Sequence, residues 1–280
     1  MTSGRWATWT TISGLRGIPV VAVVRLAGVI GSMGSLRGGL SLTGLAPVLD
    51  RAFSLGGLKA VALAINSPGG SAVQSSLIAR RIRDQAADKK VPVFAFAEDV
   101  AASGGYWLAT AADEIHADAA SIIGSIGVIS AGFGFQDLLQ RVGIERRVHT
   151  AGPRKSMLDP FRPENAEDVA RLEAIQRDIH EGFKAQVRER RGQRLKAGDD
   201  VLFSGEFWSG RRALELGLVD GIGDLRTVMR ARFGDKVKLR VVGARRGWLS
   251  RRMGLGPRAD WAGDLIAAVD ERALWSRFGL

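Results

Sequence analysis

The sequence contains no cysteine, and this absence excludes several kinds of chemistry. Disulfide frameworks, thiolate nucleophiles and cysteine-ligated zinc sites cannot be built without it. Histidine is scarce too, with three residues in a chain of 280. No metal-binding spacing such as His-Glu-x-x-His connects them. We therefore expect neither a metal nor another cofactor.

Long apolar runs are also missing. The best candidate, residues 18–30, is about 13 residues long and contains Arg25, whereas a membrane-spanning helix needs roughly 18 apolar residues. This run is typical of a buried strand. The first residues show no charged stretch followed by an apolar stretch and a cleavage site, so no secretory signal is visible. We expect a cytoplasmic protein.

The composition is that of a globular chain. Hydrophobic residues make up 46% and charged residues 25%, enough to bury a core in one large domain or two small ones. Glycine is frequent, with 36 residues that cluster in pairs such as Gly69-Gly70 and Gly104-Gly105. These pairs indicate sites where the backbone turns tightly or approaches another segment closely.

The net charge of +11 is concentrated near the C-terminus. Residues 226–258 hold eleven Lys and Arg and one acid, Asp235, a local charge of +10. Together with Trp248, Trp261 and Trp275 this is typical of a segment that lies on an anionic membrane surface. The pattern also predicts an amphipathic helix near residues 261–278. Packing of this helix on the body, or a plain solvated segment, explains the pattern equally well. Nucleic acid is not an expected partner.

Strand-like runs alternate with helical patterns, which predicts an α/β fold. The predicted strands are residues 18–30, 59–65, 91–97, 114–117, 122–129 and 146–150. The predicted helices are residues 71–87 and 163–191, and the second carries an apolar stripe at intervals of three and four. We expect one domain over residues 18–225 and a separate basic tail over residues 226–280.

The first chemical motif is the turn at residues 66–71, where a strand ends, two glycines follow and a helix begins. Such a turn can direct backbone N–H groups at an anion or a developing oxyanion. A plain strand-to-helix turn is the simpler explanation when this segment is taken alone.

The second motif is Ser103, which lies among small residues at the start of a helical stretch. Its hydroxyl would be exposed there and could act as a nucleophile, with an oxyanion held by its neighbouring N–H and one from the Gly69-Gly70 turn. Serine is also common as a helix N-cap, which is the competing explanation.

A serine nucleophile needs a base, and the histidines are weak candidates. His116 lies in a strand pattern, His149 ends a short predicted strand and His180 belongs to the long helix, so each is better explained as structural. Lys155 follows a predicted strand, and a buried neutral amine there could take the serine proton. A solvated loop lysine is the default explanation for that segment by itself.

Four segments together resemble the signal peptide peptidase A (protease IV) family of serine peptidases. They are Asn-Ser-Pro-Gly-Gly at 66–70, Ala-Ser-Gly-Gly-Tyr at 102–106, Gly-Ser-Ile-Gly-Val at 124–128 and Gly-Pro-Arg-Lys-Ser at 152–156. The likeness covers about residues 18–225 and extends to residues 203–205 and 213–220. Four ordered segments are far more specific than any one of them.

The resemblance implies a ClpP/crotonase-like α/β fold of superhelical repeated ββα units. It implies that Ser103 is the nucleophile, that Lys155 is the general base, and that Gly69, Gly70 and Gly104 form the oxyanion hole. Ser125 matches a serine that orients the lysine amine, although a turn-stabilising role is equally compatible. In the family the serine and the lysine can come from neighbouring subunits, so a homo-oligomeric ring is expected.

Three functions from different classes fit the sequence. The first is a Ser-Lys endopeptidase that cleaves hydrophobic extended peptides, such as signal-peptide or membrane-protein fragments. The second is a crotonase-type acyl-CoA enzyme, which shares the oxyanion hole but does not need the Ser103 and Lys155 pair. The third is a non-catalytic basic scaffold that binds membrane or nucleic acid through residues 226–258. Peripheral membrane attachment through this segment is compatible with the first function too.

Overall fold

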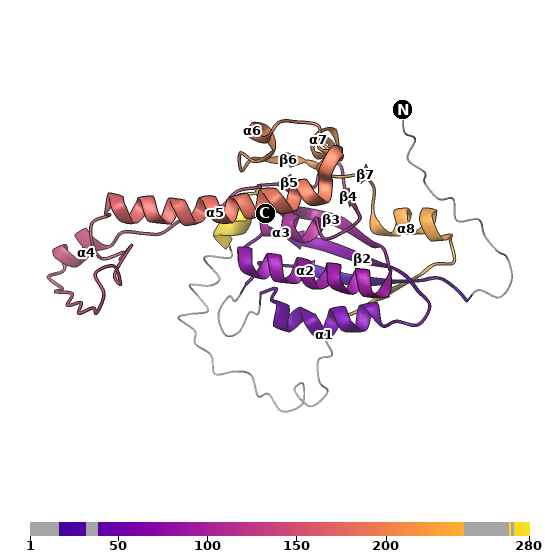
Figure 1. Ribbon diagram of the computed structural model, residues 1–280, viewed down its shortest axis with the longest axis horizontal. Coiled ribbons are helices and arrows are strands. Elements are labelled where there is room, and N and C mark those ends of the chain that lie inside the picture. Colours follow the sequence, from indigo (N-terminus) through magenta and orange to yellow (C-terminus); the bar gives the residue numbers. More distant parts are fainter. Residues whose placement is uncertain (1–16, 32–38, 244–268, 270–271) are drawn as a thin grey trace, which may run out of the picture.

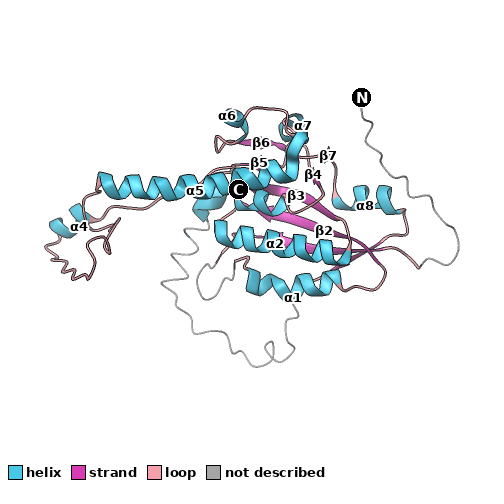
Figure 2. Cartoon of the chain, viewed as in Figure 1, coloured by secondary structure: helices cyan, strands magenta, loops and turns pink. Residues whose placement is uncertain are grey.

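A computed structural model describes residues 17–31, 39–243, 269 and 272–280 of the chain. Trp248, Trp261 and residues 244–258 of the expected membrane-binding segment therefore lie outside the described residues. The described part is a mixed α/β domain from which one long helix projects (Figures 1 and 2). The expected α/β class is confirmed.

The centre of the domain is a mostly parallel sheet. Its strand order is β6-β5-β3-β2-β1-β8, with β4 pairing to β3 and β7, and only the β5–β6 pair is antiparallel. The strands are β1 (Val20–Ala27), β2 (Leu58–Ser67), β3 (Val93–Ala102), β4 (Glu114–Ala117), β5 (Ile122–Gly124), β6 (Phe207–Ser209), β7 (Gly221–Ile222) and β8 (Lys238–Val241).

Helices connect the strands and cover both faces of the sheet (Figure 2). They are α1 (Leu42–Phe53), α2 (Ala72–Lys89), α3 (Gly104–Ala109), α4 (Gln136–Arg141), α5 (Ala166–Arg191), the 3-10 turn η1 (Gly192–Arg194), α6 (Asp199–Leu202), α7 (Gly210–Glu215) and α8 (Leu225–Phe233). We call the face under α1, α2 and α3 the near face and the face under α8 the far face.

The core explains the near-continuous apolar runs of β1, β2 and β3. Alternate residues such as Leu63 and Ile65 pack on the near face against α1, α2 and α3. Their neighbours, including Ala62 and Phe94, pack on the far face against Met229 of α8. Both sides of a parallel strand in this position are buried, so residues on both sides are apolar and the sequence is a nearly unbroken apolar stretch.

The domain extends beyond the expected boundary at residue 225. Strand β8 pairs with β1, with Val20 opposite Lys238, and Met229 of α8 is fully buried. Residues 225–241 are thus part of the domain and not a separate tail. The expectation failed because it was based on counting charged residues. The basic side chains of α8, such as Arg226 and Arg230, are on its exposed side, and a count of charges does not reveal that the opposite side of the helix is apolar.

Two predicted strands also differ from the structure. Residues 146–150 form no strand, and the strand predicted over residues 122–129 ends at Gly124. Residues 127–129 and 146–150 fall in the arm, residues 127–179, which projects beyond the body (Figure 1). Residues there lie away from the central sheet, and no ladder partner is found for them among the described strands. Apolar character alone does not make a strand without such a partner.

Helix α5 is the long helix that the apolar stripe predicts, and it begins after Asn165, whose side chain accepts from the Glu167 N–H. Its second half is anchored in the body through Phe183 and Val187, which are buried. Its first half belongs to the arm, where Ile175 is 50% exposed. Burial within one chain thus accounts for only part of the stripe.

The end of α5 is fixed by a buried ion pair. Arg191 donates to the Asp220 carboxylate at 2.7 Å and to the Gly217 carbonyl at 2.8 Å, and Asp220 also accepts from the Ile115 N–H. Partial burial by itself would raise the pKa of Asp220, but the hydrogen bond and charge of Arg191 outweigh it and hold this pKa below its usual value.

None of the described helices has the length and apolar character needed to cross a membrane.

Replacing Asp220 with asparagine should lower the free energy of unfolding by about 3 kcal/mol at neutral pH, because Arg191 would keep a buried charge without its partner. Since the pKa of Asp220 is lowered on folding, its contribution is complete above the unfolded pKa of about 3.9 and is lost as the pH falls through the folded value. Urea denaturation at several pH values should show the difference between wild type and variant shrink in acid.

Asp200→Asn, which changes an exposed carboxylate, is the matched control and should cost less than about 0.5 kcal/mol. A loss of stability as small for Asp220→Asn as for the control would contradict the role assigned to the buried pair.

Candidate active site

Ser103 lies where β3 ends and α3 begins, with an unusual backbone conformation. Its φ is 53° and its ψ is −123°, a region that non-glycine residues avoid and that costs about 1–3 kcal/mol. Its N–H donates to the Gly124 carbonyl at 2.8 Å and its carbonyl accepts from the Trp107 N–H at 3.0 Å. The side chain makes no capping hydrogen bond. The N-cap explanation of this serine is therefore not supported.

The glycine turn after β2 packs directly on Ser103. A Cβ placed on Gly69 would lie 2.7 Å from the Ser103 Cβ and 2.9 Å from the Gly104 nitrogen. Gly69 also has a φ of 106°, so both space and conformation require glycine here. Its carbonyl accepts from the Ile30 N–H at 2.8 Å, which fastens the turn to the segment after β1.

The three predicted oxyanion-hole residues differ in how their backbone N–H groups are used. The Gly69 N–H donates to the Ser67 hydroxyl at 3.2 Å, whereas no acceptor for the N–H of exposed Gly70 is found in the described part of the chain. Gly104 occupies the first position of α3, where an N–H has no intrahelical partner. Of the three predicted oxyanion-hole residues, Gly70 and Gly104 thus have the freer N–H groups.

Ser67 is a site residue that the sequence reasoning did not single out. It is fully buried, and its hydroxyl fixes the N–H of Gly69. Its position inside the Asn-Ser-Pro-Gly-Gly segment could have drawn attention to it, but the sequence does not show whether a serine in a turn is buried.

Ser125 is buried, and a backbone hydrogen bond connects the residue before it to Ser103. It follows Gly124, the residue whose carbonyl accepts from the Ser103 N–H, and it has a φ of 51°. Its own N–H donates to the Glu206 carbonyl at 2.6 Å. The structure thus brings Ser103, Ser125 and the glycine turn together.

Lys155 is not part of this group within one chain. It lies in an exposed turn of the arm, where its N–H donates to the Gly152 carbonyl. The arm projects past the start of α5, while α3 lies in the body (Figure 1). No contact between Lys155 and Ser103 is found in the described residues.

The histidines have structural surroundings. His116 stacks on Phe96 with ring centroids 5.4 Å apart, and the Nε2 of His180 lies 3.0 Å from the Ile126 carbonyl. His149 is exposed on the arm. In the part of the chain that the structure describes, no group of three or more metal-ligating side chains is found.

Helix α5 also holds α3, the helix that begins after Ser103. Trp107 stacks on Phe183 with ring centroids 4.6 Å apart. Arg190 donates to the carbonyls of Thr110 and Ala112 at 3.0 and 3.1 Å, just past the end of α3. The helix that carries the arm is therefore packed on the helix that positions the nucleophile candidate.

Known proteins were compared with this chain. Residues 85–238 match Peptidase family S49. The chain is 34% identical over 171 residues to "Serine protease SPPA, chloroplastic" of Arabidopsis thaliana, covering 60% of this chain and 24% of that protein. It is 33% identical over 186 residues to "Protease 4" of Haemophilus influenzae, covering 64% and 29%.

A more similar relative carries a different kind of name. "Na(+)/H(+) antiporter NhaA" of Brucella abortus is 52% identical over 257 residues, which is 88% of this chain but 35% of that protein. The chain thus spans about a third of the relative's length. This name applies to the whole Brucella protein, and most of that protein lies outside the match. It therefore assigns no transport activity to this chain.

A solved structure has the same fold. It is the "1510-N membrane-bound stomatin-specific protease S97A mutant", with a TM-score of 0.50 and 16% identity, covering 82% of this chain and 100% of that one. This match supports the α/β fold alone. Because the family match covers more than half of the chain and contains three of the four motif segments, those at 102–106, 124–128 and 152–156, the chain belongs to Peptidase family S49, the signal peptide peptidase A (protease IV) family.

Proposed function

We propose that this chain is a serine endopeptidase in which Ser103 is the nucleophile and Lys155 the general base. The observation that carries the proposal is the strained backbone of Ser103, which is held against the Gly69 turn with its hydroxyl free of any capping bond. Family membership favours this function over the crotonase-type acyl-CoA alternative.

The chemistry follows from these positions. The Ser103 hydroxyl attacks a peptide carbonyl, and the N–H groups of Gly70 and Gly104 stabilise the resulting oxyanion. Gly69 lets the glycine turn approach the Ser103 backbone closely. The neutral amine of Lys155 takes the serine proton, gives it to the leaving amine and then activates the water that releases the acyl group. Ser125 orients the lysine amine.

The substrates that we propose are extended hydrophobic peptides, such as signal-peptide or membrane-protein fragments. A peptide would reach Ser103 in extended form, because the serine is half-buried between the glycine turn and the loop after β5.

We also assign the finer fold, a ClpP/crotonase-like superhelix of repeated ββα units. This fold would place the glycine turn and the loop after β5 at one end of the sheet.

We propose further that the dyad is completed by a second copy of the chain in a ring. Lys155 lies on the arm, away from the Ser103 of its own chain. The arm also exposes large apolar side chains that a neighbouring copy could cover. They are Ile129, Phe133, Phe135, Leu138, Val142, Ile144, Leu158, Phe161 and Ile175.

Ser103→Ala and Lys155→Ala should each reduce cleavage of unfolded casein by at least about a thousandfold, because nucleophile and base act as one unit. Ser54→Ala and Lys59→Ala remove the same groups at exposed positions and should retain wild-type rates. Circular dichroism checks that each variant is folded. Substantial activity in either dyad variant would remove that residue from the mechanism, whereas absence of cleavage by the wild type would favour a non-catalytic scaffold.

Mixing the two inactive variants tests completion between copies. After dissociation and re-assembly, some sites would combine an intact Ser103 from one chain with an intact Lys155 from its neighbour, so part of the wild-type activity should return. Each variant re-assembled alone is the control. If mixed assemblies of confirmed composition stay inactive, the serine and lysine act within one chain.

We propose that basic residues after β8 attach the protein to anionic membranes at its surface. The positive charge of this segment and its tryptophans suit an interface, and each basic group contributes about 1 kcal/mol there. A truncation near residue 224 would remove β8 from the sheet, so charge changes give a better test.

Replacing Arg245, Arg246, Arg251 and Arg252 with serine should weaken sedimentation with anionic vesicles, and salt should weaken wild-type binding. Neutral vesicles are the control, and Arg80→Ser with Arg81→Ser on α2, compared with Arg251→Ser and Arg252→Ser alone, is the matched two-charge change elsewhere. Equal binding by wild type and the fourfold variant would assign the segment to packing or solubility.

A further inference from the structure

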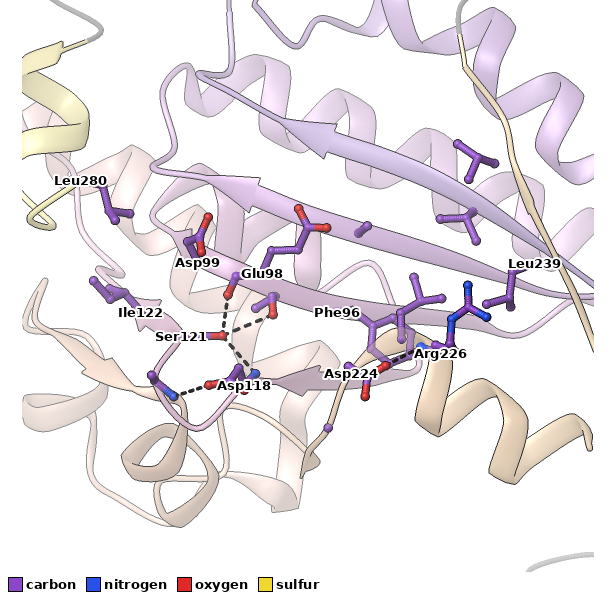
Figure 3. A pocket seen from close by; sticks show the side chains of 17 residues that line it. Phe96, Glu98, Asp99, Asp118, Ser121, Ile122, Asp224, Arg226, Leu239 and Leu280 are labelled. Carbon is purple, nitrogen blue, oxygen red and sulfur yellow. Dashed lines mark hydrogen bonds between the residues drawn. The ribbon is translucent and has the colours of Figure 1, made fainter. Parts of the chain in front are cut away.

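The far face of the sheet contains a groove that the proposed mechanism does not use. It is a cavity of about 710 Å³ beyond the start of α8 (Figure 3). Residues of β1, β2, β3, β5 and β8 line it, together with residues before and at the start of α8 and Leu280. The apolar lining includes Val23, Ala64, Phe96, Ile122, Leu225 and Val241.

The groove is open because α8 covers only part of the far face. Met229 and Phe233 pack on the sheet over Phe94. Among the described residues, α8 does not extend over the face toward the carboxyl ends of β1 and β2, and Arg25 is exposed there. Residues near the end of the chain close the other side, where Phe278 packs against Val100 and Ala102.

Carboxylates surround this apolar floor. Glu98 and Asp99 come from β3, Asp118 follows β4 and Asp224 precedes α8, and all four line the groove (Figure 3). Glu98 pairs with Arg25 at 2.7 Å. With Arg226, the groove and its edge hold four carboxylates and two guanidinium groups. This local excess of negative charge lies in a chain whose net charge is +11.

Asp99 and Asp118 are the carboxylates most available to a ligand. Asp99 accepts from the Asn66 amide at 2.6 Å and Asp118 accepts from the Ala120 N–H at 2.8 Å. Both side chains belong to exposed residues, and no ion pair is found for either in the described ranges. An ionised carboxylate accepts several hydrogen bonds, so each can still receive a cationic donor.

We propose that this groove binds an apolar peptide segment flanked by lysine or arginine, as part of the substrate chain. An apolar floor accommodates the aliphatic side chains, and the carboxylates pair with the basic ones. The same charge repels anionic lipid surfaces and nucleic acids. The identification of the occupant as substrate rests on the proposed peptidase function.

The position of the groove relative to Ser103 supports a substrate. Strand β3 runs from the groove residue Asp99 through Ala102, and Ser103 follows directly. The groove therefore lies at the carboxyl ends of the parallel strands, close along the chain to the nucleophile. A long peptide held in the groove would keep its neighbouring residues near Ser103 and raise their effective concentration there.

Binding is measured on the full chain carrying Ser103→Ala, so that no cleavage occurs. The probe is a short fluorescent peptide of leucine and alanine with two lysines at one end, followed by fluorescence anisotropy at low salt. Adding Asp99→Asn and Asp118→Asn should weaken binding about threefold to tenfold, because two exposed charge pairs are lost. Asparagine keeps one side-chain carbonyl oxygen, which can accept from the Asn66 amide at position 99 and from the Ala120 N–H at position 118, so the fold should persist.

The matched control is Asp84→Asn with Asp88→Asn, two exposed carboxylates on α2, over the near face. It should leave the affinity unchanged. Val241→Asn, at a position 70% exposed, should weaken binding about threefold through the apolar floor alone. A probe with two glutamates in place of the lysines should bind more weakly than the lysine probe.

Two results would overturn the proposal, and a third would separate it from the peptidase function. Equal weakening by both pairs of aspartate changes would show that only overall charge matters. Tighter binding after replacing Arg245, Arg246, Arg251 and Arg252 with serine would show that the chain's own basic segment competes for the groove. Absence of cleavage by wild type, with carboxylate-dependent binding retained, would contradict the peptidase function and leave the groove as a peptide-binding site.

Discussion

The close approach of two backbone turns is the constraint on which the candidate site depends. Gly69 leaves no room for a side chain against Ser103 and Gly104, and Ser103 in turn holds a backbone conformation that costs free energy. Hydrogen bonds from the Ser103 N–H to Gly124 and from Ile30 to Gly69 hold both turns in place. The parallel sheet supplies this rigidity, because β2, β3 and β5 end at the same edge.

Helix α5 links this rigid body to the exposed arm. Its second half is fixed by the Trp107–Phe183 stack, by Arg190 at the end of α3 and by the Arg191–Asp220 pair. Its first half carries apolar side chains that the body does not cover. A helix anchored in this way carries the arm, and Lys155 with it, beyond the body of the domain. A site shared between copies would need this arrangement.

The sequence predicted most of the fold where burial imposes a repeating pattern. The strands around residues 59–65, 91–97 and 114–117 and the helices near 71–87 and 163–191 are present. It failed at residues 146–150, where apolar residues have no neighbouring strand, and at residues 226–241, where exposed arginines concealed the apolar side of α8 and the pairing of β8. Both failures concern contacts between distant segments, which local composition does not record.

The sequence by itself determined the residue types and order of the candidate site, because glycine turns, a serine among small residues and a lysine after them are local patterns. It also determined the family, through the spacing of four such patterns. Only the tertiary structure decided that Gly70 and Gly104 have the freer N–H groups, that Lys155 lies on an arm away from Ser103, and that a carboxylate-lined groove opens on the far face. Each of these depends on how strands far apart in the chain pair, and pairing is set by packing of the whole sheet.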